Sequence, residues 1–328
     1  MAILVTGGAG YIGSATVELL RAQRRDVVVL DNLSKGHREA VHEKAKFIAG
    51  DVSDSPLLDR IFRENRTEAV IHFAAFIEVG ESVTEPHMYY RNNFSAALTL
   101  LEAMRRNDVN KLVFSSTAAV YGNPTQTPIE ETQLRAPINP YGRSKMMTEM
   151  AIEDSCVAHG IGYAILRYFN VAGASPDGSI GEAHEPESHL IPRILQAARG
   201  STATAKIFGT DYPTPDGTCI RDYIHVEDLV RAHALAIEAA TPGKGVIYNL
   251  GSENGFSVRE VIAACQRVTG KKFEVEENPR RPGDPAVLIA SSARIRSDLG
   301  WERQYPDIET IIAHAWNWHT SHPNGFKS

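Results

Sequence analysis

The sequence predicts an α/β fold, in which a doubly wound parallel sheet is joined to a smaller mixed α/β domain. Two observations carry this prediction. Through the first half of the chain, short β-branched runs alternate with amphipathic segments. After about residue 170 the alternation stops, and proline and glycine gather in clusters. Alternating strands and helices build a parallel sheet, because each helix returns the chain to the edge at which the previous strand began.

The elements of the sheet are expected in close succession. Strands are expected at residues 2–6, 26–30, 46–49, 69–73, 111–115 and 162–166. Helices are expected at residues 11–23, 54–65, 86–106 and 141–159. The second strand, with its run V-V-V-L, is typical of a strand that is buried on both faces. Pro86 suits the first position of its helix, where the chain needs no backbone N–H donor.

The second half of the chain has the composition of loops between short elements. Proline and glycine concentrate at residues 171–187, 209–217 and 278–285. Turn-rich segments of this kind often hold binding residues. We therefore expect one domain over residues 1–170, joined by parts of 221–250, and a second domain that comprises mainly residues 171–328.

Composition excludes several classes of function. With 328 residues, of which 43% are hydrophobic and 23% charged, the chain is typical of a globular protein. A net charge of −6 argues against a nucleic-acid surface. No window approaches the ~20 apolar residues of a membrane span, and no signal peptide is expected. Three cysteines without C-x-x-C spacing fit a reducing compartment, so we expect a cytoplasmic protein without disulfides.

The turn after the first strand reads T-G-G-A-G-Y-I-G, and it predicts a dinucleotide site. Gly7, Gly10 and Gly13 permit a tight turn and let backbone N–H groups approach a pyrophosphate at the start of a helix. Tyr11 and Ile12 lie in the same turn. A glycine-rich turn without a ligand is the alternative, but the preceding strand and the following helix favour the dinucleotide.

Asp31 ends the second strand, eighteen residues after Gly13. A carboxylate at this place accepts from both ribose hydroxyls of NAD and repels the additional phosphate of NADP. NAD is therefore the predicted cofactor, and the alternative is a solvated carboxylate at a strand end. Side chains at two further strand ends are candidates for the cofactor wall or for plain packing: Asp51, Val52, Phe73, Ala74 and Ala75.

Among the tyrosines, only Tyr141 is followed by a lysine four residues later, in the string N-P-Y-G-R-S-K. Tyr141 and Lys145 share one face of the expected helix. A free tyrosine is only ~0.1% ionised at pH 7, and lowering its pKa by ~3 units requires ~4 kcal/mol. A neighbouring ammonium and a cationic nicotinamide ring favour the phenolate. Thr117 follows an adjacent strand, where its hydroxyl can relay a proton. The alternative is an ordinary helix pair.

Strings along the whole chain resemble one family. T-G-G-A-G-Y-I-G, Asp31–Asn32, H-F-A-A, S-S-T-A-A-V-Y-G and N-P-Y-G-R-S-K resemble the extended short-chain dehydrogenase/reductases. In the second half, L-R-Y-F-N-V-A-G-A, I-F-G-T-D-Y-P-T-P-D-G-T, R-D-Y-I-H-V-E-D-L and R-R-P-G-D resemble the UDP-glucose 4-epimerases of that family. The resemblance implies tightly bound NAD, a UDP-hexose substrate, and inversion at the sugar C4 through a transient 4-keto form.

The resemblance also implies roles for individual residues. Thr117, Tyr141 and Lys145 would be catalytic, with Tyr141 as the base. Asn32, Asn92 and Phe169 would join the NAD site. The positions expected at the UDP-sugar are Asn170, Leu190, Phe208, Arg221, Arg281, Asp284 and Leu288. Phe208 could instead belong to the core, and Arg221 could instead form a local ion pair with Asp222. Helices 86–106 and 141–159 would form the interface of a homodimer.

Three places depart from the family pattern or leave it open. Ile77 and Glu78 stand where some members carry a lysine near the cofactor. His189 stands where others have an asparagine near the uridine. At the position of Leu288, a large aromatic residue restricts members to glucose and galactose, and a small residue admits N-acetyl sugars. Leucine is intermediate, so acceptance of N-acetyl sugars stays open.

Other functions remain as alternatives. Nucleotide-sugar dehydratases and decarboxylases of the same family usually carry acidic residues just after the catalytic threonine, where this chain has Ala118 and Ala119. A non-catalytic NAD-sensing regulator would not need the three catalytic residues. The histidines at positions 314, 319 and 322 are spaced too irregularly for a metal site, so no metal is expected.

Overall fold

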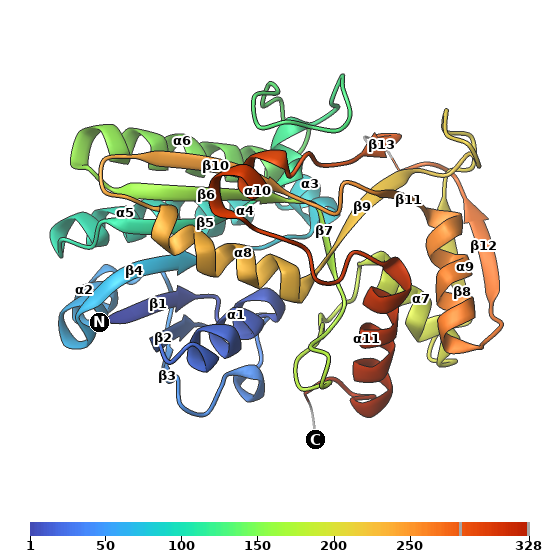
Figure 1. Cartoon of the computed structure of the whole chain (residues 1–328), viewed down its shortest axis with the longest axis horizontal. Coiled ribbons are helices and arrows are strands. Elements are labelled where there is room, and N and C mark those ends of the chain that lie inside the picture. Colours follow the sequence, from blue (N-terminus) through green and yellow to red (C-terminus); the bar gives the residue numbers. More distant parts are fainter. Residues whose placement is uncertain (282–283, 327–328) are drawn as a thin grey trace.

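A seven-stranded sheet forms the centre of the computed structural model, which describes residues 1–281 and 284–326 (Figure 1). Two residues of the proline- and glycine-rich cluster 278–285 thus lie outside the described part. The strand order is β10-β6-β5-β4-β1-β2-β3, and every neighbouring pair is parallel. The strands are β1 (Ala2–Thr6), β2 (Asp26–Asp31), β3 (Lys46–Ala49), β4 (Thr67–His72), β5 (Lys111–Thr117), β6 (Gly162–Tyr168) and β10 (Gly245–Leu250). The predicted doubly wound parallel sheet is confirmed.

The strand order changes direction between β1 and β4. From β1 the chain adds β2 and β3 on one side, and then β4, β5, β6 and β10 on the other. Ligands of such sheets bind outside the carboxyl ends of the strands at this reversal, because the connecting loops diverge there. The order of the strands alone therefore places a binding site beyond the ends of β1 and β4.

Helices cover both faces of this sheet. On one face lie α1 (Tyr11–Ala22), α8 (Val226–Ala239) and α10 (Ala293–Leu299). On the other lie α2 (Ser55–Asn65), α5 (Ala96–Arg106) and α6 (Pro140–His159). Side chains of β1 alternate between the two cores: Ile3 and Val5 pack on the first face, and Ala2 and Leu4 on the second. Burial on both faces explains why the strands read as continuous apolar runs.

The expected single helix over residues 86–106 is wrong in its first half. The structure has a short α4 (Pro86–Tyr89), a π-helical segment (Tyr90–Ser95) and then α5. Asn93 lies in the π-helical segment, where its side chain accepts from Phe76 N (2.8 Å) and donates to Phe76 O (2.9 Å). The wider turn presents this amide to a distant loop, and π-helical turns are frequent at functional sites. The helix α3 (Val79–Thr84) was not predicted.

The second half of the chain builds a separate layer, at the right of Figure 1. β9 (Ile220–His225) pairs with β7 (Asn170–Ala172), β11 (Gly255–Ser257) and β13 (Val287–Leu288), and β8 (Thr204–Phe208) pairs with β12 (Glu274–Asn278). The helices α7 (Leu190–Ala198), α9 (Val258–Thr269) and α11 (Ile308–Ser321) share one apolar core with β7, β8, β9 and β11. Short 3₁₀ turns occur at Arg38–Ala40 and Ala118–Tyr121.

The chain passes between the two layers more than once. After β9 it returns to the large sheet through α8 and β10, within the range 221–250. We therefore propose the division expected from the sequence, with residues 1–170 and parts of 221–250 in one domain and most of 171–328 in the other. None of the helices in the described ranges is long and apolar enough to cross a membrane.

Candidate active site

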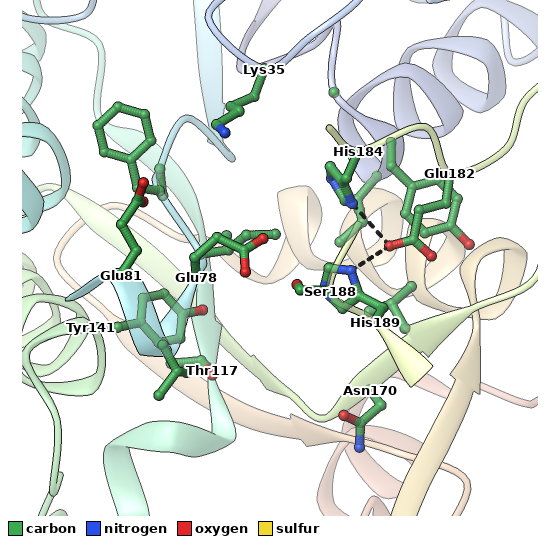
Figure 2. A pocket seen from close by; sticks show the side chains of 18 of the residues that line it. Lys35, Glu78, Glu81, Thr117, Tyr141, Asn170, Glu182, His184, Ser188 and His189 are labelled. Carbon is green, nitrogen blue, oxygen red and sulfur yellow. Dashed lines mark hydrogen bonds and ion pairs between the residues drawn. The ribbon is translucent and has the colours of Figure 1, made fainter. Parts of the chain in front are cut away.

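A cavity of about 1050 Å³ lies beyond the carboxyl ends of the large sheet, and residues of both layers line it (Figure 2). Its walls include the glycine-rich turn, the ends of β2, β4 and β5, the start of α6 and the start of α7. Every site residue predicted from the sequence except Leu288 belongs to this lining. The structure thus brings together residues that are as far apart in sequence as Gly7 and Asp284.

The glycine-rich turn is packed too closely for side chains. Gly7 has φ +72°, and a Cβ atom there would lie 2.6 Å from Ala74 N. A Cβ atom on Gly13 would lie 2.1 Å from Gly7 O. α1 begins directly after Gly10, which provides no side-chain cap, and its first turn holds no acidic residue. Its uncapped N–H groups and the positive end of the helix dipole suit an anion, so this turn fits the pyrophosphate of a dinucleotide.

Asp31 is held in place by the backbone. Its carboxylate accepts from Ala9 N (3.0 Å) and from Leu33 N (2.8 Å), and the residue is buried. The alternative of a solvated strand-end carboxylate is therefore wrong. Each carboxylate oxygen has further lone pairs, so Asp31 can accept from ribose hydroxyls while it keeps both bonds. This observation supports the fit of NAD to the glycine-rich end of the cavity.

Asn32 and Asp51 meet across the ends of β2 and β3. Asn32 Nδ2 donates to Asp51 Oδ2 (2.8 Å). Burial opposes the ionisation of Asp51, but hydrogen bonds from Ser53 and Asn32 hold its pKa below the ordinary value. Asp51 is therefore a fixed acceptor on the wall predicted for the cofactor.

Tyr141 and Thr117 share one wall of the cavity, as Figure 2 shows. Tyr141 lies in the first turn of α6, where the Asn139 side chain caps the helix by accepting from Gly142 N (2.8 Å). Burial raises the pKa of Tyr141 to about 12, the Thr117 hydroxyl lowers it, and Glu78 raises it further. The protein groups around Tyr141 therefore favour the neutral phenol, apart from Thr117.

Lys145 lines the cavity beside Tyr141 and Thr117 and is held there by a hydrogen bond. It is buried, and its Nζ donates to Ser115 O (2.8 Å) in β5. Burial lowers its pKa to about 7, against the influence of Glu149. At neutral pH the amine therefore exists in both protonation states, and a negative charge on Tyr141 would favour the ammonium form.

A buried ion pair supports α6 from below. Arg167 in β6 donates to both carboxylate oxygens of Glu149, at 2.9 and 2.7 Å, and both residues are buried. Arg135 reaches the same carboxylate from the surface side (3.1 Å). This pair was not predicted from the sequence, where its signal was an arginine inside an otherwise apolar strand, L-R-Y. It joins the helix of Tyr141 and Lys145 to the sheet.

The end of the cavity expected for the nucleotide carries two arginines. The guanidinium of Arg281 lies over the Phe208 ring, 3.9 Å from its centroid. Arg221 pairs with Asp284 and not with Asp222. Asp222 is buried and accepts from backbone N–H groups of other segments, so the alternative of a local Arg221–Asp222 pair is wrong.

The other residues expected at the sugar differ in position. Asn170 and Leu190 line the cavity, and Asn170 Nδ2 donates to Asp222 O (3.0 Å). Leu288 does not line it; it packs on the apolar cluster of Val120, Tyr121 and Ile129. Phe169 packs on the same cluster and does line the cavity. Any influence of Leu288 on the sugar therefore stays a prediction.

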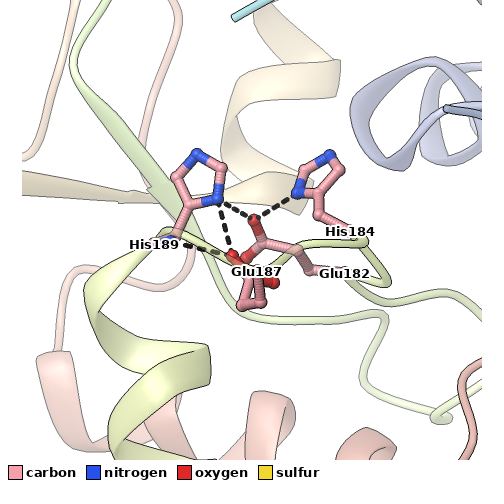
Figure 3. A group of neighbouring side chains, drawn as sticks. All are labelled: Glu182, His184, Glu187 and His189. Carbon is pink, nitrogen blue, oxygen red and sulfur yellow. Dashed lines mark hydrogen bonds and ion pairs between the residues drawn. The ribbon is translucent and has the colours of Figure 1, made fainter. Parts of the chain in front are cut away.

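The wall opposite Tyr141 carries a cluster that was not predicted from the sequence (Figures 2 and 3). Its members, spaced E-x-H-x-x-E-x-H along one loop, are Glu182, His184, Glu187 and His189. The spacing was the available signal, but the residues lie outside any helix or strand, so no periodicity marks them. His189, noted as a departure from the family pattern, is thus part of a larger group.

Comparisons with known proteins agree with this geometry. Residues 3–251 match the NAD dependent epimerase/dehydratase family. The chain belongs to this family. A UDP-glucose 4-epimerase of Halalkalibacterium halodurans is 54% identical over 329 residues, which cover 100% of this chain and 98% of the relative. The resemblance stated from the sequence is confirmed.

Solved structures from the family superpose over nearly the whole chain. The UDP-glucose 4-epimerase of Brucella ovis, in complex with NAD, is 46% identical with a TM-score of 0.93, and covers 97% of this chain and 98% of its own. That of Bifidobacterium longum, in complex with NAD+ and UDP, is 38% identical with a TM-score of 0.95. It covers 99% of this chain and 100% of its own.

Proposed function

We propose that the protein is an NAD-dependent UDP-glucose 4-epimerase, which interconverts UDP-glucose and UDP-galactose through a transient 4-keto sugar. One observation carries the proposal: Thr117, Tyr141 and Lys145 line the same cavity as the glycine-rich turn and the two arginines, Arg221 and Arg281. The relatives named UDP-glucose 4-epimerase support the same reaction.

The chemical roles follow from position. NAD held at the glycine-rich turn would supply the acceptor and donor of a hydride for the sugar C4, together with the positive charge of its oxidised ring. Tyr141 takes the proton of the 4-hydroxyl, and Thr117 donates a hydrogen bond that favours the phenolate. Lys145, held by Ser115 O, supplies a charge that responds to the state of Tyr141.

The substrate is held by its nucleotide end. Phe208 and Arg281 form a flat, cationic surface for the uracil and the diphosphate, and Arg221 lies beside them. The 4-keto sugar must present both faces to the same ring, so the sugar end has to leave room for rotation. Affinity therefore resides in the UDP part, because tight contacts to one orientation of the sugar would oppose the second half-reaction.

The protein acts as a cytoplasmic homodimer in galactose metabolism, according to this proposal. Support for the dimer comes from α5 and α6, which expose Leu98, Met150 and Val157. Val157 is 91% exposed, an unusual state for a large apolar side chain. All three cysteines are unpaired, in agreement with a reducing compartment.

The decisive experiment is direct conversion. Purified protein is incubated with UDP-galactose and, separately, with UDP-GalNAc, and the anomeric proton signals are followed by NMR. UDP-glucose is expected in the first sample. Formation of UDP-GlcNAc in the second would extend the substrate range to N-acetyl sugars. Bound NAD without conversion of UDP-galactose would overturn the proposal.

A further inference from the structure

The loop of residues 182–189 gathers two carboxylates and two imidazoles in one place (Figure 3). His189 Nδ1 lies 2.8 Å from Glu182 Oε1 and 2.9 Å from Glu187 Oε1. His184 Nδ1 lies 3.0 Å from Glu182 Oε1. One such atom from each of the four residues lies within 4.8 Å of the other three. In the described ranges, this is the one group of three or more side chains of these types so arranged.

The two carboxylates of this loop are buried. The side chains of Glu182 and Glu187 are 4% and 5% exposed, so two carboxylates lie almost entirely out of water. Buried charges require a partner of opposite sign. A divalent cation with two neutral imidazoles compensates both.

The donor atoms match one class of ion. Two imidazole nitrogens and two carboxylate oxygens are ligands of Zn²⁺ in tetrahedral sites, whereas Mg²⁺ and Ca²⁺ prefer oxygen alone. With ligand bonds of ~2.0–2.2 Å, the ligand atoms of such a site lie ~3.2–3.6 Å from one another. The distances here begin at 2.8 Å and reach at most 4.8 Å, so small side-chain movements suffice.

We propose that Glu182, His184, Glu187 and His189 bind one divalent transition-metal ion of the Zn²⁺ class. The carboxylate of Glu187 is already oriented, because it accepts from the backbone N–H groups of Ser188 and His189 at 2.8 Å each. Hydrogen bonds of this kind to a ligand fix its direction and raise metal affinity.

The position of the loop gives the ion a structural role. His189 is the residue before α7, and Leu190 begins that helix on the cavity wall. At the other end of the loop, the Ala183 carbonyl oxygen contacts His37 Nε2 (2.8 Å), next to Lys35 and Gly36 on the cofactor side. The ion would therefore hold a segment that bridges the NAD end and the UDP-sugar end of the cavity.

The competing interpretation is an ion-pair network without a metal. In this network, Glu182 and Glu187 raise the pKa of His189 well above its ordinary value, although burial lowers it. The proton on His189 then supplies the positive charge that a metal ion would otherwise bring. Both interpretations use the same contacts. They differ in whether the protein takes up a metal ion in a fixed ratio, which does not depend on epimerase activity.

The test uses the full chain with its cofactor. The protein is freed of metal with a chelator, titrated with Co²⁺, and followed by the visible absorption of tetrahedral cobalt. Zn²⁺ binding is measured by calorimetry and by the metal content after dialysis. The double variant His184→Gln/His189→Gln removes both imidazoles. His159→Gln and Cys156→Ser serve as controls, because His159 is an exposed histidine and Cys156 a half-buried thiol away from the loop.

The expected result is one Zn²⁺ per chain and a tetrahedral cobalt spectrum for the wild type and both controls. The double variant should bind at least tenfold more weakly and lose the spectrum. Zinc should also raise the Tm of the wild type. A wild type that retains no Zn²⁺ and gives only the spectrum of hydrated cobalt would overturn the proposal, even if the double variant failed to fold. Equal binding by the double variant, or loss of binding in the Cys156→Ser variant, would also overturn it.

Discussion

Tyr141 combines a half-buried position on the cavity wall with a task that requires ionisation. A pKa of about 12 leaves on the order of one phenol in 100,000 ionised at pH 7. Thr117 is the protein group that lowers this pKa, and Lys145 lies one helical turn away with a pKa of about 7. Because Lys145 titrates near neutrality, it gains a proton most readily when Tyr141 loses one. The acidity of the site is thus shared by three residues.

Removal of the phenol hydroxyl tests the base directly. The Tyr141→Phe variant should fold and retain NAD, because the aromatic ring stays in the wall. Its kcat should fall about 10²–10⁴-fold, the usual effect of losing a general acid–base group. Steady-state assays with UDP-galactose and the absorbance of bound cofactor measure both effects. A variant with full turnover would falsify the assignment of Tyr141.

Thr117 should control the pH dependence of the reaction. Its hydroxyl stabilises the phenolate, so the Thr117→Val variant should have a higher Tyr141 pKa than the wild type. A hydrogen bond to a charged group contributes about 1.5–3 kcal/mol, or about one to two pKa units. The rise of kcat with pH should therefore move to higher pH by about that amount. Thr117→Ser keeps the hydroxyl and should leave the profile in place; equal profiles for all three proteins would contradict the role.

At the scale of elements, local chemistry decided which predictions succeeded. The glycine-rich turn was predictable, because a tight turn before a helix needs glycine whatever surrounds it. The expected strands are present, but β5 and β6 each end two residues later than expected. The π-helical segment was not predictable, because its amide, Asn93, bonds to Phe76 in another loop. The Glu149–Arg167 pair was missed for the same reason, since its two members lie on different elements.

The glycine-rich turn should tolerate no side chain at Gly13. An alanine Cβ atom there would lie 2.1 Å from Gly7 O, which belongs to the backbone and cannot move aside cheaply. Gly13→Ala should destabilise the protein by about 1–3 kcal/mol and release NAD during purification. Gly80→Ala is the matched control, because no atom lies within 4 Å of its added Cβ. Urea unfolding and the content of bound NAD should distinguish the two variants. A Gly13→Ala protein with a full content of NAD and normal stability would contradict the prediction.

The pair of Arg167 with Glu149 should stabilise the joint between β6 and α6. Arg167→Met removes the buried ion-pair partner of Glu149 and leaves Arg135 on the surface side, so the free energy of unfolding should fall by about 3–5 kcal/mol. Arg267→Met breaks an exposed pair with Glu309 and should cost about 0–1 kcal/mol. Urea unfolding compares the two variants, and similar values would show that Glu149 needs no buried partner.

At the scale of the whole molecule, the site depends on contacts between its two layers. Nearly every residue predicted for the site lines the cavity, because strand ends of a parallel sheet meet at one edge, but much of the remaining lining was not predicted. Leu288 was expected at the cavity but lies outside its lining, because its position depends on how β13 pairs with β9 and packs near Val120. The fold of the loop 182–189 was also not predicted, because loops without periodicity are positioned by long-range contacts.

The exposed apolar side chains of α5 and α6 predict that these helices form the interface of a dimer. Leu98 on α5 and Met150 and Val157 on α6 are exposed, with Met150 at 48%, and the two helices pack together, so we expect these apolar side chains at an interface. Met150→Arg would place a charge that cannot be paired in the interior of a symmetric contact, where each copy meets the same surface. Analytical ultracentrifugation should therefore show a dimer for the wild type and a monomer for this variant. Leu235→Arg alters a residue of similar size and 38% exposure on α8, on the other face of the large sheet, and should remain dimeric. Dimers of both variants would mean that these helices face solvent, and a monomeric Leu235→Arg protein would place the interface on α8.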